Sequence, residues 1–224
     1  MPVPTRKSVL LAKFNVTPII HSRLLPPVTG KCHCSRSLKD KFYEFYYEEK
    51  ANPSNNGTFL AGPDCGEQIR ARLRLAHIPF VDPLTGLPTT PPTRPPSAPS
   101  STAVSATVAR DPLNSEVLQA IYLIRVLTGR SPTGGLLKTL QFVQANPTRA
   151  PAEWSVATLN AYVQSMLSTG GITLSAAIAA LPNGKTFSFP LAAVALSKEK
   201  ARNAALPAGD PHIKQPGYYT DWLN

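Results

Sequence analysis

The residues best suited to chemistry are the three cysteines, which all lie between Gly30 and Gly66. They occur in two short motifs, Gly-Lys-Cys-His-Cys at 30–34 and Gly-Pro-Asp-Cys-Gly at 62–66. A Cys-x-Cys pair can present two thiolates to one metal ion, and an adjacent glycine allows the backbone to turn tightly around a sulfur. The two motifs therefore predict a small β-plus-helix module stabilised by zinc.

A structural zinc site has four ligands, so a histidine must complete the set that the three cysteines begin. We expect this ligand to be His21, because a hairpin centred near residue 28 would place it opposite Cys34 on the returning strand. The predicted zinc ligands are therefore Cys32, Cys34, Cys65 and His21.

His33 is the second candidate for the fourth ligand, although in an extended segment its side chain points away from those of its neighbours. His77 is disfavoured, because a helix over 65–77 would hold it about 18 Å from Cys65. Two other interpretations stay open: the cysteines could be ordinary buried thiols in a small core, or Cys65 could be a reactive thiol at a helix N-terminus. No base is evident beside Cys65, which argues against cysteine catalysis.

Basic side chains surround the cysteine motifs. The aromatic run at 42–47 lies next to several of them and is typical of a platform on which bases stack, although one of its faces could instead form the core. In a helix predicted over 65–76, two arginines share one side of the apolar stripe, where they could contact phosphates or simply face solvent. The residues predicted to bind nucleic acid are Lys31, Arg36, Lys39, Lys41, Arg70 and Arg74.

Short strands and one helix must position these side chains. The pattern predicts an extended segment over 8–25, a strand over 41–49 and a return strand at 58–61. The helix over 65–76 then follows, with Asp64 as its N-cap and Glu67 three residues later in a capping-box pattern.

A proline-rich segment separates this module from the rest of the chain. From 83 to about 110 the residues are mainly Pro, Thr, Ser and Ala, a composition that favours an extended linker over a packed core. Helical patterns follow, the first of which starts at Asp111-Pro112. We therefore expect an α+β chain with a zinc module at 1–82, a linker at 83–110 and an α-helical domain at 111–224.

Charge and motif content limit the possible functions. The 224 residues carry a net charge of +10 with a pI of about 9.7, which suits nucleic acid as a partner. We expect a cytoplasmic protein with no membrane role, because no signal-peptide pattern and no apolar run near the roughly 18 residues of a membrane span is present. The glycine-rich stretch at 129–135 lacks the Lys-Ser/Thr of a phosphate loop, and no paired carboxylates stand out, so enzyme activity is not expected.

The order of parts, a cysteine module followed by a mainly helical remainder, resembles the zinc-finger-bearing small subunit of type IV CRISPR effector complexes. That resemblance implies an N-terminal zinc module, other protein subunits as partners, and contact with target DNA beside the guide-paired region. We therefore expect a non-catalytic nucleic-acid-binding or scaffold subunit of a larger complex. The alternative is a protein–protein adaptor with a structural zinc site, in which the linker and the aromatic C-terminal tail do the binding.

Overall fold

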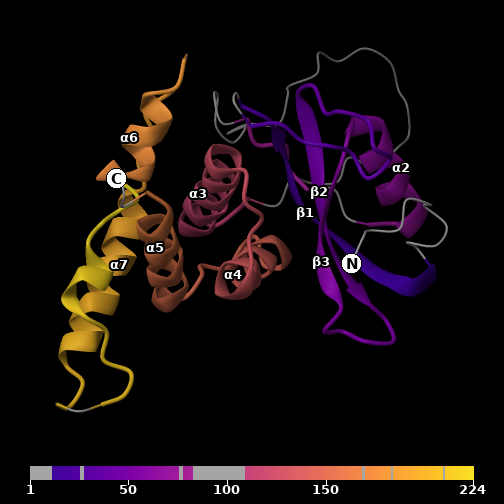
Figure 1. Cartoon of the computed structure of the whole chain (residues 1–224). Helices are drawn as coiled ribbons and strands as arrows, with labels where there is room; N and C mark the ends of the chain where they lie inside the picture. Colours follow the sequence, from indigo (N-terminus) through magenta and orange to yellow (C-terminus); the bar gives the residue numbers. More distant parts are fainter. Residues whose placement is uncertain are drawn as a thin grey trace, which may run out of the picture.

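A three-stranded antiparallel sheet forms the N-terminal half of the protein, and helices form the C-terminal half (Figure 1). This computed structural model describes residues 12–25, 28–75, 78–82, 109–167, 170–182, 184–208 and 210–224. Within them the elements are β1 (Phe14–Arg23), β2 (Lys41–Glu49), β3 (Asn56–Ala61), α2 (Pro63–Leu73), α3 (Pro112–Thr128), α4 (Gly134–Ala145), α5 (Glu153–Leu167), α6 (Leu174–Ala179), α7 (Pro190–Ala204) and the 3-10 turn η2 (Pro216–Tyr219). The mixed α+β class predicted from the sequence is confirmed.

Strand β2 is the middle strand of the sheet, and its alternation of side chains supplies both of the sheet's packed faces. Tyr43, Phe45 and Tyr47 lie in a buried cluster with Ile69 of α2. Phe42 lies in the other cluster, among residues of the C-terminal helices. The aromatic run is therefore core, as one of the two interpretations predicted, and it is not an open stacking platform.

The predicted hairpin between the first strand and the segment after residue 28 is wrong. β1 pairs instead with β2, so that His21 lies opposite Tyr43 and not opposite Cys34. The intervening segment is folded on itself, with Lys31 bridged to Ser37. The long aromatic strand β2 offers β1 a continuous ladder and a buried face, which a segment of this kind cannot provide.

The helices pack on the face of the sheet opposite α2 (Figure 1). α3 is the innermost helix, with Leu118 and Ile121 fully buried, and it shares one core cluster with Ile20 and Phe42 of the sheet. Residues on both sides of the predicted linker therefore contribute to a single core. The linker itself, up to residue 108, lies outside the described residues.

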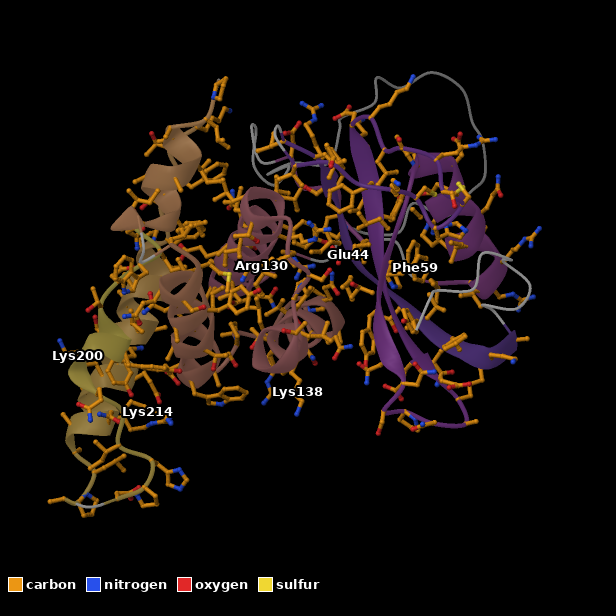
Figure 2. The ribbon with its side chains drawn as sticks, viewed as in Figure 1. Glu44, Phe59, Arg130, Lys138, Lys200 and Lys214 are labelled. Atoms are coloured by element: carbon orange, nitrogen blue, oxygen red, sulfur yellow. The ribbon has the colours of Figure 1, made fainter. Side chains whose placement is uncertain are left out.

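A buried ion pair crosses this boundary. Glu44 on β2 is fully buried, and Arg125 on α3 donates from its Nε to the Glu44 carboxylate at 2.5 Å. The Ser131 hydroxyl donates to the other carboxylate oxygen, and the Arg125 guanidinium lies over the Phe42 ring, 5.4 Å from its centroid. Figure 2 shows Glu44 between the sheet and the helices. The pair joins residues that are 81 positions apart in the sequence.

The helices α3 and α2 are capped differently at their N-termini. α3 starts as predicted, with Asp111 accepting a hydrogen bond from the Asn114 backbone N–H and proline at the first position. The predicted start of α2 at Asp64 is wrong, because its N-cap is Gly62 and Pro63 occupies the first helical position. At its other end α2 stops at Arg74, which adopts a left-handed conformation with φ of 51°.

None of the helices in the described ranges is both long and apolar enough to cross a bilayer.

The ion pair allows a direct test of the shared core. Arg125→Met should lower the free energy of unfolding by about 3–5 kcal/mol, because it leaves the buried Glu44 carboxylate without its countercharge. Glu44→Leu combined with Arg125→Met should cost less than either single change, since no charge is then left in the core. Urea unfolding measures both.

A solvent-exposed pair provides the control. Arg23 and Asp40 lie 3.0 Å apart, and the Asp40 side chain is 53% exposed, so Asp40→Asn should cost less than about 1 kcal/mol. Equal losses for Arg125→Met and Asp40→Asn would show that the Glu44–Arg125 pair does not hold the sheet to the helices.

Candidate metal centre

The first cysteine motif forms a tight knuckle at 31–37 that is fastened to the edge of β3. Within it the Ser35 backbone N–H donates to the Cys32 carbonyl at 2.7 Å, and the Cys32 N–H donates to the Arg36 carbonyl at 2.8 Å. Ser35 adopts a left-handed conformation with φ of 68°, which reverses the chain direction. The His33 N–H donates to the Leu60 carbonyl of β3 at 2.7 Å. These bonds fix both cysteines of the motif relative to the sheet.

The third cysteine is brought to the knuckle by helix α2. Cys65 lies in the first turn of this helix, directly before Gly66, which is buried against Tyr43 of β2. A Cβ atom at position 66 would overlap the Tyr43 ring, so glycine is required by the close approach of helix and strand. The expectation that this glycine allows a turn around the sulfur is therefore wrong, because the residue is helical and its role is packing.

The ligand atoms of the two motifs converge on one point. The Cys34 sulfur lies 3.2 Å from that of Cys32 and 3.8 Å from that of Cys65, and His33 Nδ1 lies 3.5 Å from the Cys32 sulfur. Ligand atoms of Cys32, His33 and Cys65 all lie within 4.8 Å of one another, and Cys34, which is close to the other two sulfurs, is not part of that set. A tetrahedral ion with bonds of about 2.3 Å to sulfur and about 2.0 Å to nitrogen needs sulfur–sulfur edges of about 3.8 Å and sulfur–nitrogen edges of about 3.5 Å. The cluster could therefore hold one metal ion.

Hydrogen bonds from the backbone lower the pKa of a thiol in this cluster, and burial raises it. A hydrogen bond from the Arg36 backbone, followed by one from the Cys32 thiol, lowers the pKa of Cys34. Burial, followed by the neighbouring thiols of Cys32 and Cys34, raises the pKa of Cys65 to about 11. The Gly62 backbone N–H also lies 3.5 Å from the Cys32 sulfur, as a donor. A divalent cation among the three sulfurs would supply the positive charge that lets all of them ionise together.

The histidine in this group is His33, and His21 is not a member of it. The His21 ring is stacked on Tyr43 with 3.8 Å between ring centroids, and it meets the edge of Phe80 at 5.0 Å. The argument against His33 assumed an extended backbone, but the knuckle is a turn, so neighbouring side chains are no longer directed to opposite sides. His77 lies outside the described residues.

The residues predicted to bind nucleic acid fall into two kinds. Arg70 is half-buried, and its guanidinium donates to the Glu67 carboxylate at 2.7 and 3.0 Å, while Glu67 also accepts from the Tyr43 hydroxyl. The ion pair therefore lies within α2, and it is Glu67 that links this helix to Tyr43 of the sheet. The others are exposed side chains: Lys31, Arg36, Lys39, Arg74, and Lys41, whose Nζ lies 5.0 Å from the Phe80 ring centroid.

The chain belongs to the protein family described as "Uncharacterised conserved protein UCP028583", whose model matches residues 4–204. No curated protein and no solved structure matches the chain.

Cobalt titration distinguishes the two histidines. His33→Ala should weaken Co²⁺ binding about tenfold or more, since even the loss of an outer-shell partner of a metal ligand typically costs 10–100-fold. His21→Phe, which keeps a ring against Tyr43, should leave the affinity unchanged. The readout is the thiolate-to-cobalt absorption during titration of the full chain. The opposite order of effects would restore His21 as the ligand.

Gly66→Ala tests the helix–strand contact that positions Cys65. Alanine raises helix propensity by up to about 1 kcal/mol, but the overlap of its Cβ with Tyr43 should cost about 1–3 kcal/mol and weaken metal binding. Arg72→Ala on the exposed side of the same helix is the matched control and should change neither quantity. Urea unfolding and the same cobalt titration measure the two effects, and a more stable Gly66→Ala variant would contradict the packing role.

Proposed function

We propose that the chain is a non-catalytic subunit of a larger complex and that it binds nucleic acid through a zinc-stabilised N-terminal module. One observation carries this proposal: three exposed cations, Lys31, Arg36 and Lys39, lie in and beside the knuckle that holds two of the thiol ligands. Zinc is the metal that best suits cysteine thiolates together with an imidazole, and Cys32, His33 and Cys65 supply such a set. We call these three cations the knuckle cations.

The knuckle cations are attached to a backbone that cannot rearrange freely. Hydrogen bonds join Leu38 to Gly30 and Cys32 to Arg36, and a metal bound at the cysteines would add a further constraint. A phosphate contact made from such a segment loses less conformational entropy than one made from a flexible loop. The arrangement therefore supports a preformed surface for a polyanion.

Arg74, exposed at the C-cap of α2, adds a further cation to the same module. Nine residues separate Cys65 from Arg74, which is about 14 Å along a helix at about 1.5 Å per residue. Phosphates of one strand recur about every 3.4 Å along a duplex axis, so the surface can meet several of them. Because the aromatic run is core, we expect the binding to be electrostatic and largely independent of base sequence.

The resemblance to the type IV CRISPR small subunit extends this proposal to an RNA-guided complex with DNA as its target. The sheet module followed by helices is compatible with that layout, and the proposed partners are other subunits and DNA or RNA. The proposal of a non-catalytic role draws on the buried Glu44 carboxylate, which is fully engaged by Arg125 and Ser131 in an ion pair that joins sheet and helix.

A protein–protein adaptor is the second candidate function. Large apolar side chains are exposed on the outer helices, among them Trp154 on α5 and Leu191 and Val194 on α7, at 51%, 40% and 53% of their full exposure. Such residues can contact another subunit. Both functions could belong to one chain, but only the first requires affinity for nucleic acid that falls steeply with salt.

Salt-dependent binding tests the proposal. Arg36→Ala combined with Lys39→Ala should weaken binding to single- and double-stranded oligonucleotides about equally across sequences and lower the salt slope by about two contacts. Folding should not change, because both side chains are exposed. Arg70 is not a suitable position for such a variant, because it is half-buried and paired with Glu67.

Lys138→Ala combined with Lys200→Ala is the charge-matched control, because Figure 2 shows both lysines on the helices, away from the sheet module. Metal analysis of the protein purified without added metal should give about one zinc per chain. A wild-type protein that binds no oligonucleotide at low salt, or equal salt slopes for the two double variants, would favour the adaptor.

A further inference from the structure

A groove on the far side of the helices from the sheet has the composition of a ligand site. It lies between α5, α7 and the C-terminal tail, and its volume is about 530 Å³. This is within the range of about 300–1,000 Å³ that is typical of small-molecule sites. Its walls combine aromatic rings, cations and one carboxylate, which is a mixture that the knuckle does not have.

The carboxylate belongs to Glu199, which is only 9% exposed. One oxygen accepts a hydrogen bond from Arg202 at 2.7 Å. The other oxygen, Oε2, is buried and has no hydrogen-bond partner in the described part of the chain. A buried acceptor without a donor is costly, so this oxygen is suited to a donor that a ligand brings. The Glu199 charge also adds to burial in raising the pKa of Tyr219, which places the carboxylate beside that ring.

Aromatic and cationic groups surround Glu199. The Trp154 indole is half exposed and lines the groove together with Tyr218 and Tyr219. Arg202 and Lys214 are exposed cations at the same groove, and Figure 2 shows Lys214 beside α7. Stacking surfaces, a single buried acceptor and outer cations are the three features that a nucleotide needs for its base face, its base edge and its phosphate.

The tail that forms one wall is held in place by side-chain amides. Asn160 of α5 is fully buried; its Nδ2 donates to the Thr220 carbonyl at 2.7 Å, and its Oδ1 accepts from the Trp222 N–H at 2.8 Å. Asn203 of α7 makes a two-way clamp with the Lys214 backbone at 2.7 and 3.1 Å. The wall is therefore part of the fold, and the groove does not depend on an unsupported loop.

We propose that this groove binds a nucleotide whose base carries an exocyclic amino group, cytosine or adenine. The base stacks on Trp154, its amino group donates to Glu199 Oε2, and its phosphate lies against Lys214 and Arg202. This site is separate from the knuckle cations, which lie on the other side of the sheet, so it goes beyond the proposed function and does not depend on it. A free nucleotide and a nucleotide within a single strand share this chemistry.

The other ligand that aromatic rings and a carboxylate can hold is a quaternary or methylated ammonium. The charges argue against it here, because Arg202 neutralises Glu199 and Lys214 adds a further positive charge at the groove. An anionic ligand with one hydrogen-bond donor is the better match for these groups.

Calorimetric titration of the full chain with CMP and UMP tests the proposal, since the two differ in the amino group that Glu199 would accept from. CMP should bind about tenfold more tightly than UMP. Glu199→Gln should abolish or reverse this preference, because the amide presents a donor where the carboxylate has an acceptor. Lys214→Ala should weaken CMP but not cytidine, while Lys200→Ala, on the same helical layer, should weaken neither.

Trp154→Ala, a change at an exposed position, should weaken CMP and UMP alike and keeps the test informative if Glu199→Gln lowers the melting temperature. In the Arg36→Ala/Lys39→Ala variant, which lacks two knuckle cations, oligocytidylate that binds more tightly than CMP would assign the groove to a strand, and equal affinity would assign it to the free nucleotide. Equal affinities for CMP and UMP, no binding of either, or Glu199-dependent binding of tetramethylammonium in their place would overturn the proposal. Loss of oligonucleotide binding in the knuckle variant alone would leave it intact.

Discussion

The buried pair of Glu44 and Arg125 is the constraint on which the arrangement of sheet and helices depends. Removing two charges from water costs several kcal/mol per ion, so neither partner can be buried without the other and its remaining hydrogen bonds. Here the Ser131 hydroxyl donates to the second oxygen of the Glu44 carboxylate, and the Arg125 guanidinium lies over the Phe42 ring. Because Glu44 is on the middle strand and Arg125 on the innermost helix, this one contact fixes the position of β2 relative to the helical layer.

The metal centre is positioned from the opposite face of the same strand. Tyr43 follows the alternation of β2 to the face away from Arg125, where α2 approaches it closely at Gly66 and so places Cys65. The knuckle is placed separately, through the bond from His33 to Leu60 of β3. A metal at the cysteines would then join two segments that both rest on the sheet, which is how metal binding in a small module contributes to folding stability.

Local patterns predicted some of this correctly. The α+β class, the alternation of β2 and the start of α3 at Asp111-Pro112 all depend on residues a few positions apart. The pairing of β1 depends on distant residues, because β1 pairs with β2 and not with the knuckle segment between them. The left-handed residue of the knuckle is Ser35, and a serine gives no sequence signal for that conformation. The partner of Glu44 could not be found either: alternation shows which face it is on, but Arg125 is 81 residues away. The knuckle bend is also what makes His33 a candidate ligand in place of His21.

Only the cations that are not already paired with a buried or neighbouring carboxylate are free to attract an anionic ligand. Arg125 is bound to Glu44 across the boundary of sheet and helices, and Arg70 is bound to Glu67 within α2. The cations that remain exposed include those at the knuckle, which belongs to the sheet module, and those at the groove, which lies between α5, α7 and the C-terminal tail. The sheet and the helices share one core that lies between the two surfaces, so a single strand could engage both only if it were long enough to span that distance. A short ligand can therefore bind only one of the two surfaces at a time. The knuckle offers contacts to phosphates alone, whereas the groove also offers contacts to the edge of a base.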